Sequence, residues 1–255
     1  MEYLKLNVEN FVAVITMDAP PVNAVSAGLM DEMIAAFDQM SDRDDVRVVV
    51  LTGAGKIFCA GADIKSRANK VFEPGERWAH SRRARELSYS IMECKKPVIA
   101  AVNGPALGAG MGIAVSCDIL MCSDNASFGL PEVDVGLMGG GRHAMRVCGH
   151  SLTRRMMLTG DRISGDELYR RGIVEACVPR DNLMATAMEM AARIAAKSPI
   201  ASRTAKNSAA TIENMTLRDG YRFEQNMTAE LGQTEDSREA MRAFAEKRSP
   251  VFHGR

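Results

Sequence analysis

The apolar residues of the first two thirds of the chain follow two periodicities, one typical of strands and one typical of helices. Alternation of apolar and polar residues over 4–14, broken by Glu9 and Asn10, predicts a β-hairpin. Apolar residues at every third or fourth position over 29–40 predict a helix with Ser26 as its N-cap. Continuous apolar runs predict buried strands at 46–51, 97–102, 119–122 and 174–178. Strands separated by helical patterns indicate an α/β fold with parallel strand pairing.

The pattern changes near residue 180, and no run after residue 182 predicts a strand. Ser198 followed by Pro199 is a helix start, with serine as the N-cap and proline at the first helical position. The spacing of Asp236 and Glu239 is that of a capping box and predicts another helix start. We therefore expect an α/β core at 1–195 and a C-terminal helical region at 196–255, whose apolar faces must be covered, with a partner subunit as the candidate.

Composition narrows the class of protein. The chain has 255 residues, 46% of them hydrophobic, which is ordinary for a soluble enzyme. Lys plus Arg and Asp plus Glu each number 32, so no excess of positive charge favours a nucleic-acid partner. The most apolar stretch, 98–117, is interrupted by Asn103, Pro105 and glycines, which argues against a membrane span.

The termini and cysteines bear on the cellular compartment. The first ten residues lack the basic and apolar regions of a secretory signal. The 6 cysteines show no Cys-x-x-Cys spacing, so we expect buried free thiols rather than a disulfide framework or a zinc site. Both features lead us to expect a cytoplasmic protein without a bound metal.

Three glycine-rich segments, at 58–64, 103–112 and 136–143, are candidates for ligand contact. Small residues at strand-to-helix turns let a ligand approach backbone N–H groups, and a helix N-terminus adds the positive end of a dipole. The run 139–144 also fits a G-x-G-x-x-A dinucleotide pattern, which leaves a nicotinamide-dependent enzyme as an alternative. That run lies in mid-chain and follows no clear strand, so the pattern is weak. No G-x-S-x-G or H-E-x-x-H motif is present.

Several segments, spread in order over nearly the whole chain, match one known family. They are Phe58-Cys59-Ala60-Gly61-Ala62-Asp63-Ile64-Lys65, Pro97-Val98-Ile99-Ala100-Ala101-Val102-Asn103-Gly104-Pro105-Ala106-Leu107-Gly108-Ala109-Gly110, Cys117-Asp118-Ile119, Phe128-Gly129-Leu130-Pro131-Glu132, Leu158-Thr159-Gly160-Asp161-Arg162-Ile163 and Phe244-Ala245-Glu246-Lys247-Arg248. Together they resemble the crotonase (enoyl-CoA hydratase/isomerase) superfamily. The resemblance implies a spiral of ββα units, C-terminal helices that build trimers or hexamers, and an acyl-CoA thioester substrate with no separate cofactor.

The resemblance also implies an oxyanion hole. Members of this family pass through a thioester enolate, and two backbone N–H groups stabilise its negative charge. By similarity the donors are the N–H groups of Ala62 and Ala109; removing one such donor typically lowers the rate by ~10²–10³-fold. Ala60, Asp63, Ile64 and Lys65 resemble the coenzyme A-binding part of the family, and Gly108 and Gly112 are further substrate-binding candidates.

The acid/base position departs from the pattern of the family's hydratases, which use two glutamates twenty residues apart. Glu132 matches the second of them, and the first position is occupied by Gly112. A glycine can neither hold a water molecule nor pass a proton. Glu132 is therefore the expected acid/base residue, with a pKa raised by the acyl pocket. The N–H of Gly140 matches a backbone donor that the family places near this glutamate.

Besides the nicotinamide-dependent alternative, three functions stay open at this point. The first is an enoyl-CoA hydratase-type enzyme with a single glutamate. The second is a Δ3,Δ2-enoyl-CoA isomerase, for which one carboxylate suffices. The third is a non-catalytic acyl-CoA-binding homologue. His143 is either a second acid/base group or an ordinary helix residue, and the variable segment 66–85, with Phe72 and Trp78, is expected to shape the acyl pocket.

Overall fold

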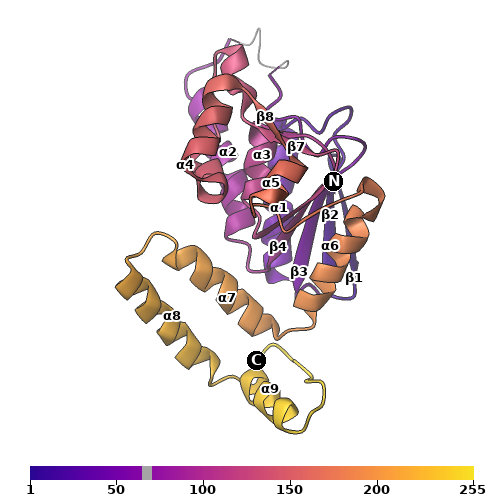
Figure 1. Ribbon diagram of the computed structural model, residues 1–255, viewed down its shortest axis with the longest axis vertical. Coiled ribbons are helices and arrows are strands. Elements are labelled where there is room, and N and C mark those ends of the chain that lie inside the picture. Colours follow the sequence, from indigo (N-terminus) through magenta and orange to yellow (C-terminus); the bar gives the residue numbers. More distant parts are fainter. Residues whose placement is uncertain (65–70) are drawn as a thin grey trace.

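The computed structural model describes residues 1–64 and 71–255 and has the predicted α/β architecture. A six-stranded sheet in the order β1-β2-β3-β4-β6-β9 forms its centre (Figure 1). Its strands are β1 (Leu4–Glu9), β2 (Val12–Met17), β3 (Val48–Gly53), β4 (Val98–Val102), β6 (Ile119–Ser123) and β9 (Ala176–Val178). The predicted hairpin pairs β1 with β2 antiparallel, and the later neighbours pair parallel.

Helices cover both faces of this sheet, so its central strands β3 and β4 are buried along their whole length. Val49 and Leu51 of β3 pack into the core with α1 (Ala27–Asp42) and α2 (Glu76–Met92). Val48 and Val50 of the same strand face the opposite way, toward α6 (Arg180–Ala195). Ser26 caps α1 as predicted, because its hydroxyl accepts a hydrogen bond from the N–H of Leu29.

A second, smaller sheet lies where the glycine-rich segments meet. It consists of β5 (Ala106–Leu107), β7 (Ser127–Gly129) and β8 (Arg162–Ser164), in the order β5-β7-β8. These strands are too short for a hydrophobic period to predict them. The elements that follow them are α3 (Ala109–Val115), the 3₁₀ helix η2 (Pro131–Val135), α4 (Gly141–Thr159) and α5 (Gly165–Arg170).

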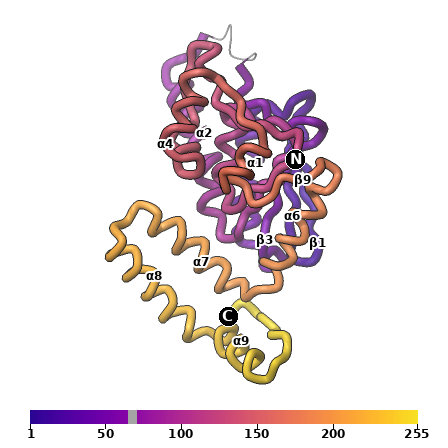
Figure 2. The backbone as a smooth tube through the Cα atoms, viewed as in Figure 1, coloured from indigo at the N-terminus to yellow at the C-terminus, as the bar shows by residue number. Residues whose placement is uncertain are grey.

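The last helices form an arm that extends away from the sheet (Figures 1 and 2). They are α7 (Pro199–Ile212), α8 (Leu217–Leu231) and α9 (Glu235–Ala245). Ser198 caps α7 as predicted. Lys206 of α7 is buried and lies 2.9 Å from a carboxylate oxygen of Asp118, and it also donates to the carbonyl oxygens of Ile91 and Lys96. These contacts of Lys206 hold α7, the first helix of the arm, against the core.

The start of α9 differs from the sequence prediction. The residue that caps the helix is Thr234, whose hydroxyl accepts a hydrogen bond from the N–H of Ser237. Asp236 is instead buried, where its carboxylate accepts hydrogen bonds from the hydroxyl of Ser198 and from the N–H groups of His253 and Gly254. The predicted capping box is wrong because this carboxylate joins the chain end to the start of α7.

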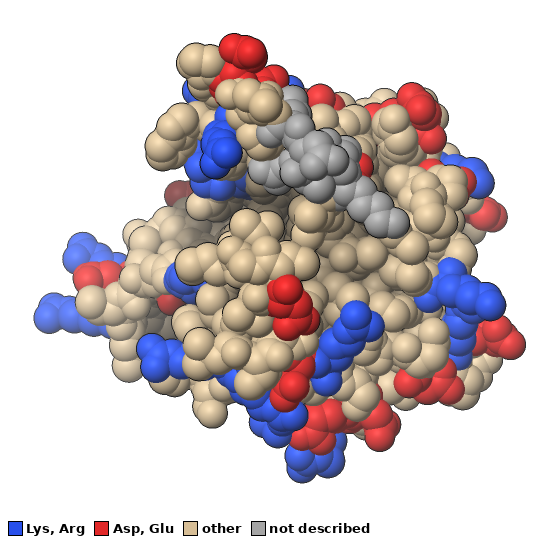
Figure 3. Space-filling model, turned by 90° about the horizontal axis from the view of Figure 1, so that it is seen from above, with Lys and Arg blue, Asp and Glu red and all other residues tan. Residues whose placement is uncertain are grey.

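Several global properties follow from the same description. The cysteines are free thiols; Cys59, Cys94, Cys117 and Cys122 are buried as expected, whereas Cys148 and Cys177 are only half-buried. In the part of the chain that the structure describes, no helix has both the length and the apolar character needed to cross a membrane. On the face seen in Figure 3, basic and acidic side chains are interspersed around a largely uncharged centre.

Candidate active site

The small sheet brings the first two glycine-rich segments together. Cys59 forms a parallel bridge with Ala106, and its carbonyl oxygen accepts a hydrogen bond of 3.0 Å from the N–H of Leu107. Gly61 follows with a φ of +100°, and a Cβ there would lie 2.8 Å from the carbonyl oxygen of Leu107 and 3.6 Å from the backbone nitrogen of Ala109. This close approach requires glycine and sets the backbone before Ala62 directly against the start of α3.

The two predicted donor N–H groups are free to meet a ligand at this junction. Val25 bonds to both neighbours of Ala62, because its N–H donates to the carbonyl oxygen of Gly61 and its carbonyl oxygen accepts from the N–H of Asp63. Within the described residues, no backbone hydrogen bond uses the N–H of Ala62 itself. Ala109 is the first residue of α3, and the N–H groups of a first helical turn have no acceptor within the helix.

Two buried asparagines brace the loop that leads into the first of these turns. The side-chain amide of Asn23 donates to three carbonyl oxygens within 54–58, at 2.8–3.2 Å. The side chain of Asn103 accepts from the N–H of Gly53 and donates to the carbonyl oxygen of Gly55, both at 3.1 Å. The sequence analysis missed these roles because both asparagines act on residues more than thirty positions away.

Glu132 lies over the start of α3. It is the second residue of η2, which follows β7. A Cβ on Gly108 would lie 2.8 Å from Oε1 of Glu132, and a Cβ on Gly139 would lie 3.6 Å from the same atom. Gly108 has a φ of +54°. Both the backbone conformation and the close carboxylate therefore call for glycine at position 108, and Glu132 sits beside the residue that precedes Ala109.

The environment of Glu132 suits a proton acceptor. Its side chain is half-buried, and its Oε2 atom is buried with no hydrogen-bond partner among the residues that the structure describes. Burial raises the pKa of this carboxyl above its usual value, because the charged form loses solvation and a backbone hydrogen bond replaces only part of it. A carboxylate with a raised pKa is a stronger base than a solvated one.

Gly140 closes the other side of the same region. It is the N-cap of α4 with a φ of +70°, and a Cβ there would lie 2.7 Å from a methyl group of Leu130 and 4.0 Å from the carbonyl oxygen of Gly108. The residues before it form a 3₁₀ helix and a loop, not a strand. The dinucleotide pattern at 139–144 therefore lacks the strand-turn-helix context that nicotinamide binding requires.

Gly112 lies one helical turn beyond Gly108. Its N–H donates to the carbonyl oxygen of Gly108 at 3.0 Å, and the residue is buried. A Cβ on Gly112 would meet no atom within 4 Å. Unlike Gly61 and Gly108, this position has room for a side chain, so packing does not explain its glycine.

The segment predicted to bind coenzyme A continues from the first turn to the surface. The N–H of Ala60 donates to the carbonyl oxygen of Val22 at 3.1 Å, and the N–H of Asp63 donates to that of Val25 at 3.2 Å. Ile64 is exposed. Lys65 lies outside the described residues, so its predicted contact stays a prediction.

The segment predicted to shape the acyl pocket is only partly described, since 66–70 lie outside the described residues. Phe72 is half-buried, and the guanidinium carbon of Arg77 lies 4.9 Å from the centre of its ring. Trp78 is 74% exposed on α2. In this chain Trp78 therefore lies on the outer surface of α2 and does not line a closed pocket.

Two further groups near the site have altered acidity. His143 lies in the first turn of α4 with Nδ1 buried and unpartnered among the described residues, and burial, with Arg146 and Arg142 nearby, lowers its pKa. Burial raises the pKa of the Cys59 thiol to about 12, so this thiol stays protonated and is no nucleophile.

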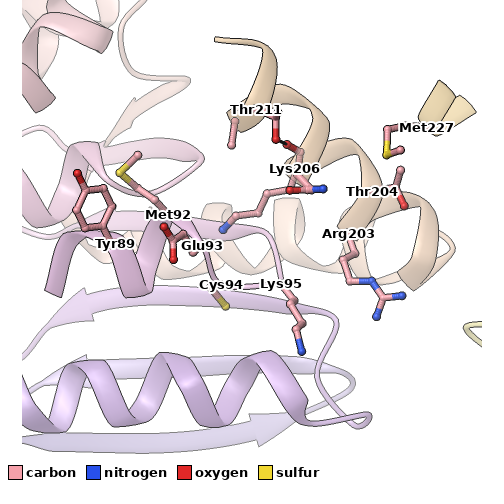
Figure 4. Close-up of a pocket in the computed structure, with 12 residues that line it drawn as sticks. Tyr89, Met92, Glu93, Cys94, Lys95, Arg203, Thr204, Lys206, Thr211 and Met227 are labelled. Atoms are coloured by element: carbon pink, nitrogen blue, oxygen red, sulfur yellow. Dashed lines mark hydrogen bonds between the residues drawn. The ribbon is translucent and has the colours of Figure 1, made fainter. Parts of the chain in front are cut away.

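A distinct cleft of about 620 Å³ separates the core from the arm. Side chains from the end of α2, such as Tyr89 and Met92, face residues of α7, including Arg203 and Lys206, across it (Figure 4). Neither Glu132 nor the paired turns line this cleft. It therefore belongs to the junction between arm and core and not to the candidate active site.

Comparisons with known proteins agree with this arrangement. Residues 7–255 match the family described as enoyl-CoA hydratase/isomerase. A probable mitochondrial enoyl-CoA hydratase of Dictyostelium discoideum is 36% identical over 248 residues, covering 96% of this chain and 88% of the relative. A 2,3-dehydroadipyl-CoA hydratase of Escherichia coli K12 is 32% identical over 265 residues and is matched over 100% of both chains.

The fold agrees as well. The crystal structure of an enoyl-CoA hydratase from Bacillus anthracis superposes with a TM-score of 0.94 at 32% identity, covering 99% of this chain and 100% of the other. This confirms the predicted crotonase-type α/β fold with helices at the C-terminus. Fold, sequence and the paired turns thus agree, and the chain belongs to the enoyl-CoA hydratase/isomerase family of enzymes.

Proposed function

We propose that this protein hydrates an enoyl-CoA thioester, with Glu132 as the single side-chain acid/base and the N–H groups of Ala62 and Ala109 as the oxyanion hole. The observation that carries the proposal is the position of the Glu132 carboxylate, half-buried, unpartnered at Oε2 and packed against Gly108. Relatives named enoyl-CoA hydratase support the same chemistry.

The proposed steps need only one carboxylate. Glu132 takes a proton from water as the water oxygen bonds to the β-carbon. The electrons of the double bond move toward the thioester carbonyl oxygen, which accepts hydrogen bonds from Ala62 and Ala109. The proton held by Glu132 then moves to the α-carbon as the carbonyl re-forms, so one water molecule is added and the carboxylate is restored. The N–H of Gly140 helps to orient the attacking water molecule beside Glu132.

A second candidate, Δ3,Δ2-enoyl-CoA isomerisation, is favoured by one observation, the glycine at position 112. In that reaction Glu132 removes a proton from the α-carbon, the same oxyanion hole holds the dienolate, and Glu132 returns the proton to the γ-carbon. This reaction uses no water, so it does not need the second carboxylate that position 112 lacks.

The substrate supplies coenzyme A, and we propose no other cofactor. Backbone groups of Ala60, Asp63 and Ile64, together with Lys65, form the proposed coenzyme A contact. We further propose that the arm joins copies of the chain into a trimer or hexamer. Large apolar side chains exposed on the arm and near Glu132 support this, namely Leu217, Tyr221, Met241, Phe244, Val135, Leu137 and Met138.

The deciding experiment presents purified protein with crotonyl-CoA and, separately, with 3-hexenoyl-CoA, and follows the mass and the spectrum of the products. Addition of one water to crotonyl-CoA is the expected result. Conversion of 3-hexenoyl-CoA at constant mass, with crotonyl-CoA untouched, makes the protein an isomerase. Tight binding of both thioesters without any product overturns both reactions and leaves an acyl-CoA-binding protein.

A further inference from the structure

The first turns of α4 are joined to the arm by two arginine side chains. Nε of Arg146 donates to both carboxylate oxygens of Glu213, at 2.7 Å and 3.0 Å, and Glu213 is the residue at which α7 ends. One turn earlier on α4, the guanidinium of Arg142 donates to the side-chain oxygen of Asn214 at 3.2 Å. Both contacts therefore connect the start of α4 to the corner between α7 and α8.

The ion pair between Arg146 and Glu213 is partly shielded from solvent. The two side chains are only 22% and 32% exposed, and partly buried pairs are screened less by salt than exposed ones. The hydrogen bonds from Arg146 lower the pKa of the Glu213 carboxyl, so it stays charged near neutral pH. The guanidinium of Arg146 also donates to the sulfur of Met92 at 3.5 Å. Arg146 therefore lies where α4, the end of α2 and the arm meet, and it contacts all three.

Apolar packing gives this part of α4 only small contacts. Among residues 141–148 the buried ones are Gly141 and Ala144, whose side chains reach no further than a methyl group. The segment that leads into α4 adds little, because residues 133–138 are all exposed. The position of the first turns of α4 therefore depends in large part on the polar contacts with the arm, the ion pair of Arg146 first among them.

The same end of α4 borders the candidate active site. Gly140 is the N-cap of α4, and a Cβ on it would lie 4.0 Å from the carbonyl oxygen of Gly108. Gly108 is the residue against which the Glu132 carboxylate packs. A shift of the first turns of α4 therefore moves Gly140 relative to Glu132, and a displacement of about 1 Å can lower a rate by ~10²-fold.

We propose that Arg146 is a positioning residue, which through its ion pair with Glu213 fixes the N–H of Gly140 relative to the Glu132 carboxylate. The inference rests on the proposed function, because the N–H of Gly140 is the group assigned there to orient the attacking water molecule. The arm, which supplies none of the proposed catalytic groups, thereby affects the rate of hydration.

A double-mutant cycle tests whether the two side chains act through each other. Arg146→Gln, Glu213→Gln and the variant with both changes are assayed with crotonyl-CoA. We expect each single change to lower kcat by about 2–30-fold, the usual range for coupling over a distance, with KM unchanged. The double variant should be no slower than the slower single variant, because both changes remove the same contact. A loss of kcat in the double variant equal to the product of the two single losses overturns the inference.

A second ion pair at the other end of α4 provides the matched control. Asp161→Asn breaks the pair between Arg155 and Asp161, which is also 2.8 Å long but more exposed, and it should leave kcat unchanged. Melting temperatures above the assay temperature show that the variants are folded. A lowered melting temperature of Glu213→Gln with unchanged kcat makes the pair purely structural and overturns the inference. An equal loss of kcat in Asp161→Asn overturns it as well.

Hydrogen exchange tests the same contact without turnover and separates this inference from the proposed function. In Glu213→Gln the amides of 141–148 should exchange faster than in the natural chain, whereas those of β3 and β4 should not change. Faster exchange at 141–148 in a chain that hydrates no thioester contradicts the proposed function and supports the positioning of α4 by the arm. Hydration by the natural chain, with exchange and kcat both unchanged in Glu213→Gln, supports the proposed function and overturns the inference.

Discussion

The two halves of the candidate site are built in opposite ways. The paired turns at 58–64 and 103–110 are packed against each other, bridged between Cys59 and Ala106 and held by buried asparagine amides. The Glu132 segment at 131–140 lies at the surface, and Met138 within it is 83% exposed. The proposed oxyanion donors are thus fixed by the core, whereas the proposed base is one side chain on a surface segment. Substitutions in the turns should lower stability and activity together, whereas substitution of Glu132 should lower activity without lowering stability.

The largest expected effect on kcat is in the Glu132 segment. Glu132→Gln keeps the shape of the side chain and removes its basicity, so we expect kcat to fall by ~10²–10⁴-fold, the usual contribution of a general acid/base. The far-ultraviolet circular dichroism spectrum should stay unchanged, because no packing contact is lost. A variant that retains kcat within a few-fold on every accepted thioester would show that Glu132 is not the base.

The next largest effect is expected where the two halves of the site meet, at the contact between Gly108 and the Glu132 carboxylate. Gly108→Ala places a Cβ 2.8 Å from Oε1 of Glu132 and forces an alanine to a φ of +54°. Displacing the carboxylate by about 1 Å should lower kcat by ~10²-fold. Gly149→Ala is the control, since it also puts alanine at a positive φ outside the left-handed helical region but meets no atom within 4 Å. Equal losses of kcat in the two variants would attribute the effect to backbone strain and not to Glu132.

A smaller effect, on both stability and kcat, is expected in the paired turns. Asn103→Ala leaves the N–H of Gly53 and the carbonyl oxygen of Gly55 without their side-chain partner. Loss of a buried hydrogen-bond partner costs about 1–3 kcal/mol of unfolding free energy. Urea unfolding measures that loss, and kcat should fall with it because the loop leads into the Ala62 turn. An unchanged kcat in a destabilised variant would show that the loop held by Asn103 does not position the Ala62 turn.

The smallest effect concerns pH and stability. Burial raises the pKa of Glu132 in the folded chain above its value in the unfolded chain. In the pH window between these two values the folded state holds the proton more firmly, so this group's contribution to stability falls as the pH rises through the window and is level above it. Glu132→Gln cannot titrate. The unfolding free energy of the variant relative to the natural chain should therefore be higher at about pH 7 than at about pH 4, and urea unfolding at both values measures this. The opposite order would mean that the carboxylate is stabilised when folded.

The long elements of the fold could be predicted from the sequence because their hydrophobic periods run over five or more residues. The helix capped by Ser26 and the buried strand at 48–53 are examples. β5, β7 and β8 are two or three residues long, so no period could indicate them, although they bring the two turns together. The predicted start of α9 was wrong because the carboxylate of Asp236 accepts tertiary hydrogen bonds and does not cap the helix.

Within the site, the resemblance to the family was more informative than composition or spacing. It singled out Glu132 and the missing partner at Gly112. Only the structure shows that Gly108 is needed for close approach while Gly112 has empty space beside it. The contacts of Asn23 and Asn103 with the loop gave no local signal, because the carbonyl oxygens to which their side chains donate are distant in sequence.

The buried lysine at the base of the arm has a consequence for local unfolding. Lys206 bonds to the end of α2, to Lys96 two residues before β4, and to Asp118 beside β6, so α7 cannot detach without leaving a charge and three acceptors unpaired. Segments that open together exchange their amide hydrogens together. The amides around Lys206 should therefore exchange more slowly than those near Ile212, where α7 ends.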